Sequence, residues 1–291
     1  MKLIIEILVF SGFLFLINSC KQTRTEIETT STLVLKKKYS QILNDSIDFR
    51  VYYPPIEKNQ KVINIIYLLH GHGGSEDDWT SEEEGNIQLI LDSLIYNDLI
   101  PPVVAVTFDA GNSWYVDSKI SMEQFFIKEW IPFVETEIIG KYSIDLRIIA
   151  GNSAGGYGTL GFSLKYPDIF DASLLLSPAA YYPTPPMISS SRKIDVFNDE
   201  DGFSEEVWKS YSYHNINIDT SDVSKYPSFY ISTGDDDPYE IVDVVVQLQS
   251  FFKENGLEHE LSIINGGHSW DVWKDRFSYD IVRVFQGLRV K

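Results

Sequence analysis

Five short runs of apolar residues dominate the sequence, and segments with helical spacing of apolar residues lie between most of them. The runs cover residues 62–69, 103–108, 146–150, 172–176 and 228–233. Strands that are apolar on both faces are typical of a parallel sheet covered by helices on each side. The helical segments lie at 86–96, 122–139, 154–166 and 239–255, with one more strand at 260–264 and a closing helix at 272–288. This alternation predicts an α/β fold with a mainly parallel, doubly wound sheet.

Two parts of the chain depart from the alternation. Segments 32–39 and 46–53 have the composition of strands and lie before the first buried run, so we expect them to add antiparallel strands at an edge of the sheet. Residues 181–226 are rich in Pro, Ser, Tyr and Asp and are too long for an ordinary connection. We interpret them as an insertion over the carboxyl edge of the sheet, where ligands bind in such folds.

Charge and composition exclude several classes of protein. The chain has 24 Lys and Arg against 42 Asp and Glu, a net charge of −18, which argues against nucleic acid as its main partner because phosphate binding needs clustered cations. Hydrophobic residues make up 44% of its 291 positions, enough for a core in one large domain or two small ones. A single cysteine excludes an internal disulfide framework.

That cysteine follows an N-terminal segment typical of secretion signals. Met1 and Lys2 precede an apolar run from Ile7 to Ile17, which is too short for a membrane span, and Cys20 comes just after it. The arrangement resembles the lipobox of bacterial lipoproteins, in which the cysteine is acylated. We therefore expect a signal peptide at 1–19, a polar tether at 20–34, a domain at 35–291 and a lipid anchor on the cell envelope. An ordinary signal or an N-terminal anchor with an unmodified Cys20 remains the alternative.

The sequence Gly-Asn-Ser-Ala-Gly at 151–155 matches the G-x-S-x-G pattern. A predicted strand leads into it and a predicted helix follows, which is the setting of a nucleophile elbow that exposes the hydroxyl of Ser153. The helix start behind the serine also offers backbone N–H groups. The alternative is a glycine-rich turn with an inert serine.

A serine hydroxyl needs a base, and the order serine, acid, histidine along an α/β-hydrolase chain makes His268, the last of five histidines, the candidate. The acid should follow the strand at 228–233, where Asp235, Asp236 and Asp237 are adjacent. Spacing alone leaves the choice among them open, and aspartates ahead of a helix also serve its N-terminus. His214 and His259 have no functional context of this kind.

The Gly-rich sequence LLHGHGG at 68–74 follows a buried strand. In a hydrolase fold this loop supplies one oxyanion N–H, and the residue after the nucleophile, Ala154, supplies the other. A metal site from His70 and His72 is the competing interpretation, but the further Asp and His ligands that such motifs need do not follow. We expect neither a metal nor a cofactor.

These motifs together resemble an esterase family of α/β-hydrolases that includes feruloyl and acetyl-xylan esterases, S-formylglutathione hydrolase and mycobacterial mycolyltransferases. The resemblance rests on LLHGHGG, DAGNSWYVDS, GNSAGGYGTL, STGDDDPY and GGHSW and runs over residues 35–290. It implies an α/β-hydrolase fold. The residues that it implies are the nucleophile Ser153, the acid Asp237, the base His268, the oxyanion amides of His72 and Ala154, and substrate contacts at Trp114, Tyr115 and Trp270.

The predicted function is therefore a serine carboxylesterase working through an acyl-enzyme. Acetyl or feruloyl esters of polysaccharide are the substrates that the resemblance suggests. Aromatic residues of the insertion at 181–226 could stack on such a substrate or form the insertion's own core. An acyltransferase, a serine peptidase and a non-catalytic carbohydrate-binding lipoprotein stay open as alternatives.

Overall fold

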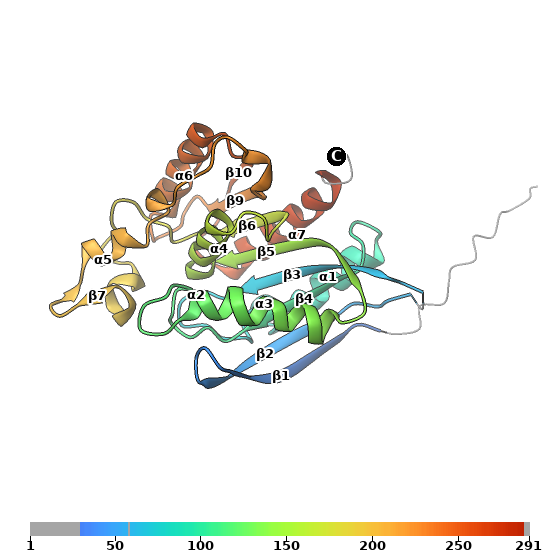
Figure 1. Cartoon of the computed structure of the whole chain (residues 1–291). Helices are drawn as coiled ribbons and strands as arrows, with labels where there is room; N and C mark the ends of the chain where they lie inside the picture. Colours follow the sequence, from blue (N-terminus) through green and yellow to red (C-terminus); the bar gives the residue numbers. More distant parts are fainter. Residues whose placement is uncertain (1–29, 58, 288–291) are drawn as a thin grey trace, which may run out of the picture.

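The computed structural model describes residues 30–57 and 59–287. Its main sheet has eight strands in the order β1-β2-β4-β3-β5-β6-β9-β10 (Figure 1). Their bounds are β1 (Thr32–Ser40), β2 (Asp45–Tyr53), β3 (Val62–Leu69), β4 (Val103–Phe108), β5 (Ser143–Asn152), β6 (Ala172–Leu176), β9 (Ser228–Gly234) and β10 (His259–Ile264). β1 and β2 are antiparallel at one edge, and the other six strands are parallel. The predicted α/β architecture is confirmed.

Helices cover both faces of this sheet. They are α1 (Ile87–Tyr96), α2 (Met122–Phe125), the π-helical turn η1 (Phe126–Trp130), α3 (Ile131–Phe133), the π-helical turn η2 (Val134–Ile139), α4 (Ala154–Lys165), α6 (Ile241–Asn255) and α7 (Trp270–Gly287). Ile66 and Leu68 of β3 belong to the core under α1 and α7, whereas Tyr67 and Leu69 belong to the core under the segment from α2 to η2. Neighbouring residues of one strand are thus buried on opposite faces, which explains its nearly unbroken apolar sequence. Among the helices described, none is long and apolar enough to cross a bilayer.

The ends of several elements differ from the sequence prediction. β1 begins at Thr32, so the folded part starts inside the range 20–34 that was predicted as a tether. α6 begins at Ile241 rather than Tyr239, because Glu240 has a left-handed backbone (φ 62°) and breaks the helical path. α7 begins two residues earlier than predicted, at Trp270. The predicted signal peptide and Cys20 lie outside the described residues.

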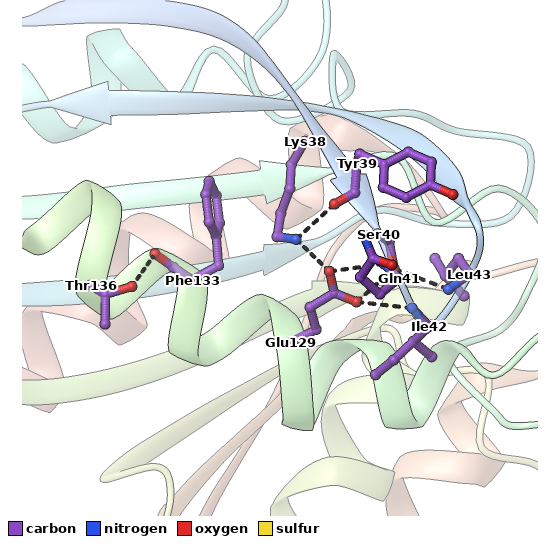
Figure 2. A network of polar contacts seen from close by, with 9 residues as sticks. All are labelled: Lys38, Tyr39, Ser40, Gln41, Ile42, Leu43, Glu129, Phe133 and Thr136. Atoms are coloured by element: carbon purple, nitrogen blue, oxygen red, sulfur yellow. Dashed lines mark hydrogen bonds and ion pairs between the residues drawn. The ribbon is translucent and has the colours of Figure 1, made fainter.

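A single carboxylate fastens the edge hairpin to the helical layer. Glu129 of η1 accepts hydrogen bonds from Lys38 Nζ, from Ser40 Oγ and from the backbone N–H groups of Gln41 and Ile42, as Figure 2 shows. Burial by itself favours the neutral acid, but these donors outweigh it and lower the pKa of Glu129. The carboxylate therefore stays ionised and ties the turn between β1 and β2 to the helix.

The insertion between β6 and β9 is made of short elements and lies to one side of the sheet in Figure 1. They are the 3₁₀ turns η3 (Ser190–Lys193), η4 (Asp195–Phe197), η5 (Tyr213–Asn215) and η6 (Val223–Lys225), the strands β7 (Asn198–Asp199) and β8 (Gly202–Phe203), and the helix α5 (Glu205–Ser210). Trp208 and Tyr213 are buried in the core that α4 and α6 share, and Trp208 stacks on Tyr157 of α4 at 5.5 Å. These two rings pack in the core, whereas Tyr181 reaches the cavity described next.

Candidate active site

Ser153 occupies the sharp turn between β5 and α4, with φ 55° and ψ −115°. This backbone is costly for a residue with a side chain and is typical of a nucleophile elbow. The flanking glycines make the turn possible. A Cβ at Gly151 would lie 2.3 Å from the carbonyl oxygen of Gly155, and a Cβ at Gly155 would lie 2.2 Å from that of Leu69. Both positions of the G-x-S-x-G pattern therefore exclude any larger residue.

Backbone bonds to the end of β6 and to the segment after it hold the turn in place. The Ser153 N–H donates to the carbonyl oxygen of Leu176 at 2.9 Å, and the N–H of Ala179 donates to the carbonyl oxygen of Ser153 at 3.0 Å. Ser153 lines a cavity of about 310 Å³ at the carboxyl edge of the sheet. That volume is at the lower end of the range found for small-molecule sites.

His268, which lines the same cavity, is paired with a buried aspartate. His268 Nδ1 lies 2.6 Å from Asp237 Oδ2, and the Asp237 side chain has no exposed surface. The other oxygen, Oδ1, accepts the backbone N–H of Tyr239 at 3.0 Å. Since a carboxylate only accepts hydrogen bonds, Nδ1 carries the proton and Nε2 is left free to accept one.

The neighbouring aspartates have other contacts. Asp235 Oδ1 accepts the N–H of Gly266 at 3.0 Å and so fastens the loop that carries His268 to the end of β9. The Asp236 N–H donates to the carbonyl oxygen of the same glycine. Of the three candidates that spacing left open, the structure brings Asp237 to His268.

The His268 ring makes edge-to-face contacts with two aromatic side chains, Tyr239 at 4.8 Å and Trp273 at 5.0 Å. His268 and Ser153 both line the cavity. In the part of the chain that the structure describes, no hydrogen bond joins the two side chains. Such bonds are often long in unliganded enzymes and tighten only when substrate is bound.

The loop after β3 is fixed by side-chain donors to three consecutive carbonyl oxygens. Trp79 Nε1 donates to Leu69 at 3.0 Å, Tyr115 Oη donates to His70 at 2.9 Å, and His70 Nδ1 lies 2.7 Å from the carbonyl oxygen of Gly71. The backbone here leaves the sheet, so side chains replace the strand partners that its carbonyl groups have lost.

This loop adjoins the nucleophile. A Cβ at Gly71 would lie 3.5 Å from the Cβ of Ser153, and His72 lines the cavity. The N–H groups of His72 and Ala154 donate to no acceptor among the described residues. The His72 imidazole lies 3.5 Å from Trp114 Nε1, and partial burial, the largest effect, lowers its pKa.

The structure separates the three predicted substrate contacts. Trp114 and Trp270 line the cavity, but Tyr115 does not. Tyr115 is buried in the core under α2 and α4, where its hydroxyl supports the loop after β3 through the carbonyl oxygen of His70. Its predicted role in substrate binding is therefore replaced by a structural one.

Sequence reasoning missed two acidic side chains of the cavity wall, Asp78 and Glu84. Burial raises the pKa of each, and for Glu84 the charge of Asp78 adds to the effect. They lie in a loop without periodicity, and nothing but its position after the Gly-rich sequence could have pointed to them. No group of three or more His, Cys, Asp or Glu side chains that could share a metal ion forms within residues 30–57 and 59–287.

Several known proteins are similar to this chain. An acetyl esterase of Caldicellulosiruptor saccharolyticus is 26% identical over 266 residues, which cover 81% of this chain and 91% of that protein. An endo-1,4-beta-xylanase/feruloyl esterase of Xylanibacter ruminicola is 31% identical over 138 residues, which cover 45% of this chain and only 19% of that relative. A ferulic acid esterase of known structure superposes with a TM-score of 0.73 over 88% of this chain and 98% of its own, at 22% identity, which supports the fold.

The family model described as "Putative esterase" matches residues 40–284, most of the chain. The elbow at Ser153, the loop at 70–74 and the Asp237–His268 pair all lie within the matched range. The chain thus belongs to the Putative esterase family and is an ester hydrolase with an α/β-hydrolase fold.

Proposed function

We propose that the protein hydrolyses carboxylic esters through a Ser153–His268–Asp237 triad. The observation that carries this proposal is the buried Asp237–His268 pair, whose histidine lines the same cavity as the strained Ser153. Each member comes from a loop at the carboxyl ends of parallel strands, where hydrolase sites form.

In acylation, His268 Nε2 takes the proton of Ser153 Oγ as the oxygen attacks the ester carbonyl carbon. The imidazolium that forms is stabilised by Asp237. The carbonyl oxygen becomes negatively charged and accepts hydrogen bonds from the N–H groups of His72 and Ala154, which have no other acceptor among the described residues. When the intermediate collapses, the C–O bond breaks and the alcohol leaves with the proton from His268.

In deacylation, water takes the place of the alcohol. His268 removes a proton from the water, which attacks the acyl-enzyme, and Ser153 leaves with that proton as the carboxylic acid is released. This chain of steps uses only protein groups and water.

For substrates we propose acetyl or feruloyl esters, such as those attached to polysaccharide. Relatives named as an acetyl esterase and a feruloyl esterase support the acyl groups. The aromatic walls of the cavity, Trp114, Tyr181 and Trp270, suit a planar acyl group or a sugar ring.

The test compares wild type with Ser153→Ala on aryl acetates, feruloyl esters, acetylated xylan and a thioester. We expect hydrolysis of at least one class by wild type and a loss of about 10⁴-fold or more in the variant. Products formed with an added acceptor alcohol distinguish a hydrolase from an acyltransferase. A variant as active as wild type would contradict the mechanism.

We also propose that Cys20 is lipidated and holds the enzyme at the bacterial cell envelope. The support is the apolar run before this cysteine and the polar segment after it. Labelling of the expressed protein with an alkyne fatty acid should be lost in Cys20→Ser. Equal labelling of both forms would contradict the anchor.

A further inference from the structure

We infer that His70 is a positioning residue for the oxyanion hole. Its side chain binds the carbonyl oxygen of Gly71, and the same peptide unit carries the N–H of His72. The inference rests on the proposed function, since it concerns the oxyanion donor of that same site. The triad chemistry by itself requires no imidazole at this position.

The geometry of one peptide unit carries the argument. The carbonyl oxygen of Gly71 lies 2.7 Å from His70 Nδ1. This oxygen and the N–H of His72 belong to the same peptide unit, and the described cis bond of the chain is at Tyr182–Pro183, so the unit is trans. In a trans peptide the C=O and N–H point in opposite directions. The Gly71 oxygen also accepts the backbone N–H of Gly74, at the longer distance of 3.3 Å. The shorter bond from His70 is therefore the main side-chain constraint on the direction of the His72 N–H.

The two ends of the unit face different surroundings. The His70 ring is buried on the core side, 6.0 Å from the ring of Tyr115. Gly71 and His72 line the cavity, and Gly71 packs against Ser153. The N–H that points away from the His70 ring thus points toward the side of the loop where the tetrahedral intermediate forms.

The second ring nitrogen of His70 fixes its tautomer. Nε2 accepts the N–H of Ala110 at 2.9 Å, so it carries no proton. The carbonyl oxygen of Gly71 can only accept, so Nδ1 must carry the proton. Burial, the largest effect, lowers the pKa of His70 and keeps the ring neutral. One imidazole therefore joins the Gly71–His72 peptide to the loop that begins at Ala110.

The role of His70 can be separated from simple loop support by two substitutions. Asn places an amide N–H near the position of Nδ1, so His70→Asn keeps the donor to Gly71 and loses the acceptor for Ala110. Gln places its amide oxygen near the position of Nε2, so His70→Gln keeps the acceptor and loses the donor. Tyr115→Phe is a matched control. It removes the donor to the carbonyl oxygen of His70, whose peptide unit carries the N–H of Gly71 and not that of His72.

We expect His70→Gln to lower kcat about 100-fold, which is close to the effect of removing one oxyanion donor. KM should be nearly unchanged, because the oxyanion forms only after the substrate has bound. Its affinity for a trifluoromethyl ketone, which forms a tetrahedral oxyanion, should fall by a similar factor. His70→Asn should stay within about tenfold of wild type. Tyr115→Phe should lower the melting temperature without that loss of kcat.

Equal losses of kcat in the Asn and Gln variants, or a loss in Tyr115→Phe as large as in His70→Gln, would overturn the inference. Nitrogen-15 NMR of wild type gives a test that needs no variant, because a proton on Nε2 of His70 would also overturn it. Activity that survives in Ser153→Ala would instead contradict the proposed function, so the two failures are distinguishable.

Discussion

Replacing Asp237 by Asn removes one buried charge and almost no volume, so its effect on the rate can be worked from the structure. Asp237 Oδ2 lies 2.6 Å from His268 Nδ1, and the exposed fractions of the two side chains are 0% and 10%. In the transition state the pair becomes a carboxylate beside an imidazolium, with charge centres about 4 Å apart. At an effective dielectric constant of about 20 this attraction is worth about 4 kcal/mol. Since about 1.4 kcal/mol corresponds to tenfold in rate, Asp237→Asn should lower kcat about 1000-fold.

The assay is steady-state hydrolysis of an aryl acetate, with thermal unfolding as a check that each variant is folded. Asp235→Asn and Asp236→Asn are matched controls, because they remove the same charge from adjacent positions that have no hydrogen bond to His268 among the described residues. Both should stay within about threefold of wild type. An unchanged kcat in Asp237→Asn, or an equal loss in either control, would refute the reasoning.

Two further predictions concern stability and substrate charge. Glu129→Gln should destabilise the fold by about 1.5–3 kcal/mol near neutral pH, the usual value of a hydrogen bond to a charged group. Because the folded-state pKa of Glu129 is lowered, its contribution is present above the unfolded pKa and is lost as the pH falls through the folded pKa. Chemical unfolding of both proteins between pH 7 and pH 3 tests this, and a difference that does not change with pH would contradict it. Asp78→Asn and Glu84→Gln should each raise kcat/KM for an anionic ester, relative to a neutral ester of equal size, by about fivefold, the equivalent of about 1 kcal/mol of relieved repulsion. Unchanged selectivity in both variants would show that these carboxylates do not act on bound substrate.

The strands were predictable because burial on both faces leaves a continuous apolar sequence. The bounds of β3, β4 and β6 agree with the prediction at both ends. Helix ends were less predictable, because they depend on single backbone angles such as that of Glu240. Glutamate is not a residue type that favours a left-handed angle, so the sequence gives no sign of this helix start.

The candidate site was predictable where a motif requires one backbone shape. The G-x-S-x-G pattern identifies Ser153 because larger residues at Gly151 and Gly155 would collide with backbone atoms. Asp237 could not be chosen from spacing, since the direction of each side chain in the turn after β9 depends on the turn itself. Contact with His268 decides among the three aspartates.

Trp114 and Tyr115 show the limit of such reasoning most clearly. Both have a left-handed backbone, with φ 52° and 63°, in one irregular loop. Trp114 reaches the cavity and Tyr115 turns into the core, a difference of direction that neither residue type nor spacing encodes. Asp78 and Glu84 were missed for a related reason, because irregular loops bring them to the cavity.

Trapping of the acyl-enzyme tests the central claim most directly. The enzyme is mixed with an activated ester, quenched in acid within the first turnover and digested for mass spectrometry. We predict an acyl group on the peptide that contains Ser153, and its absence in Ser153→Ala. Rapid turnover without an acyl group on Ser153, or an acyl group on another residue while Ser153→Ala stays active, would contradict the account.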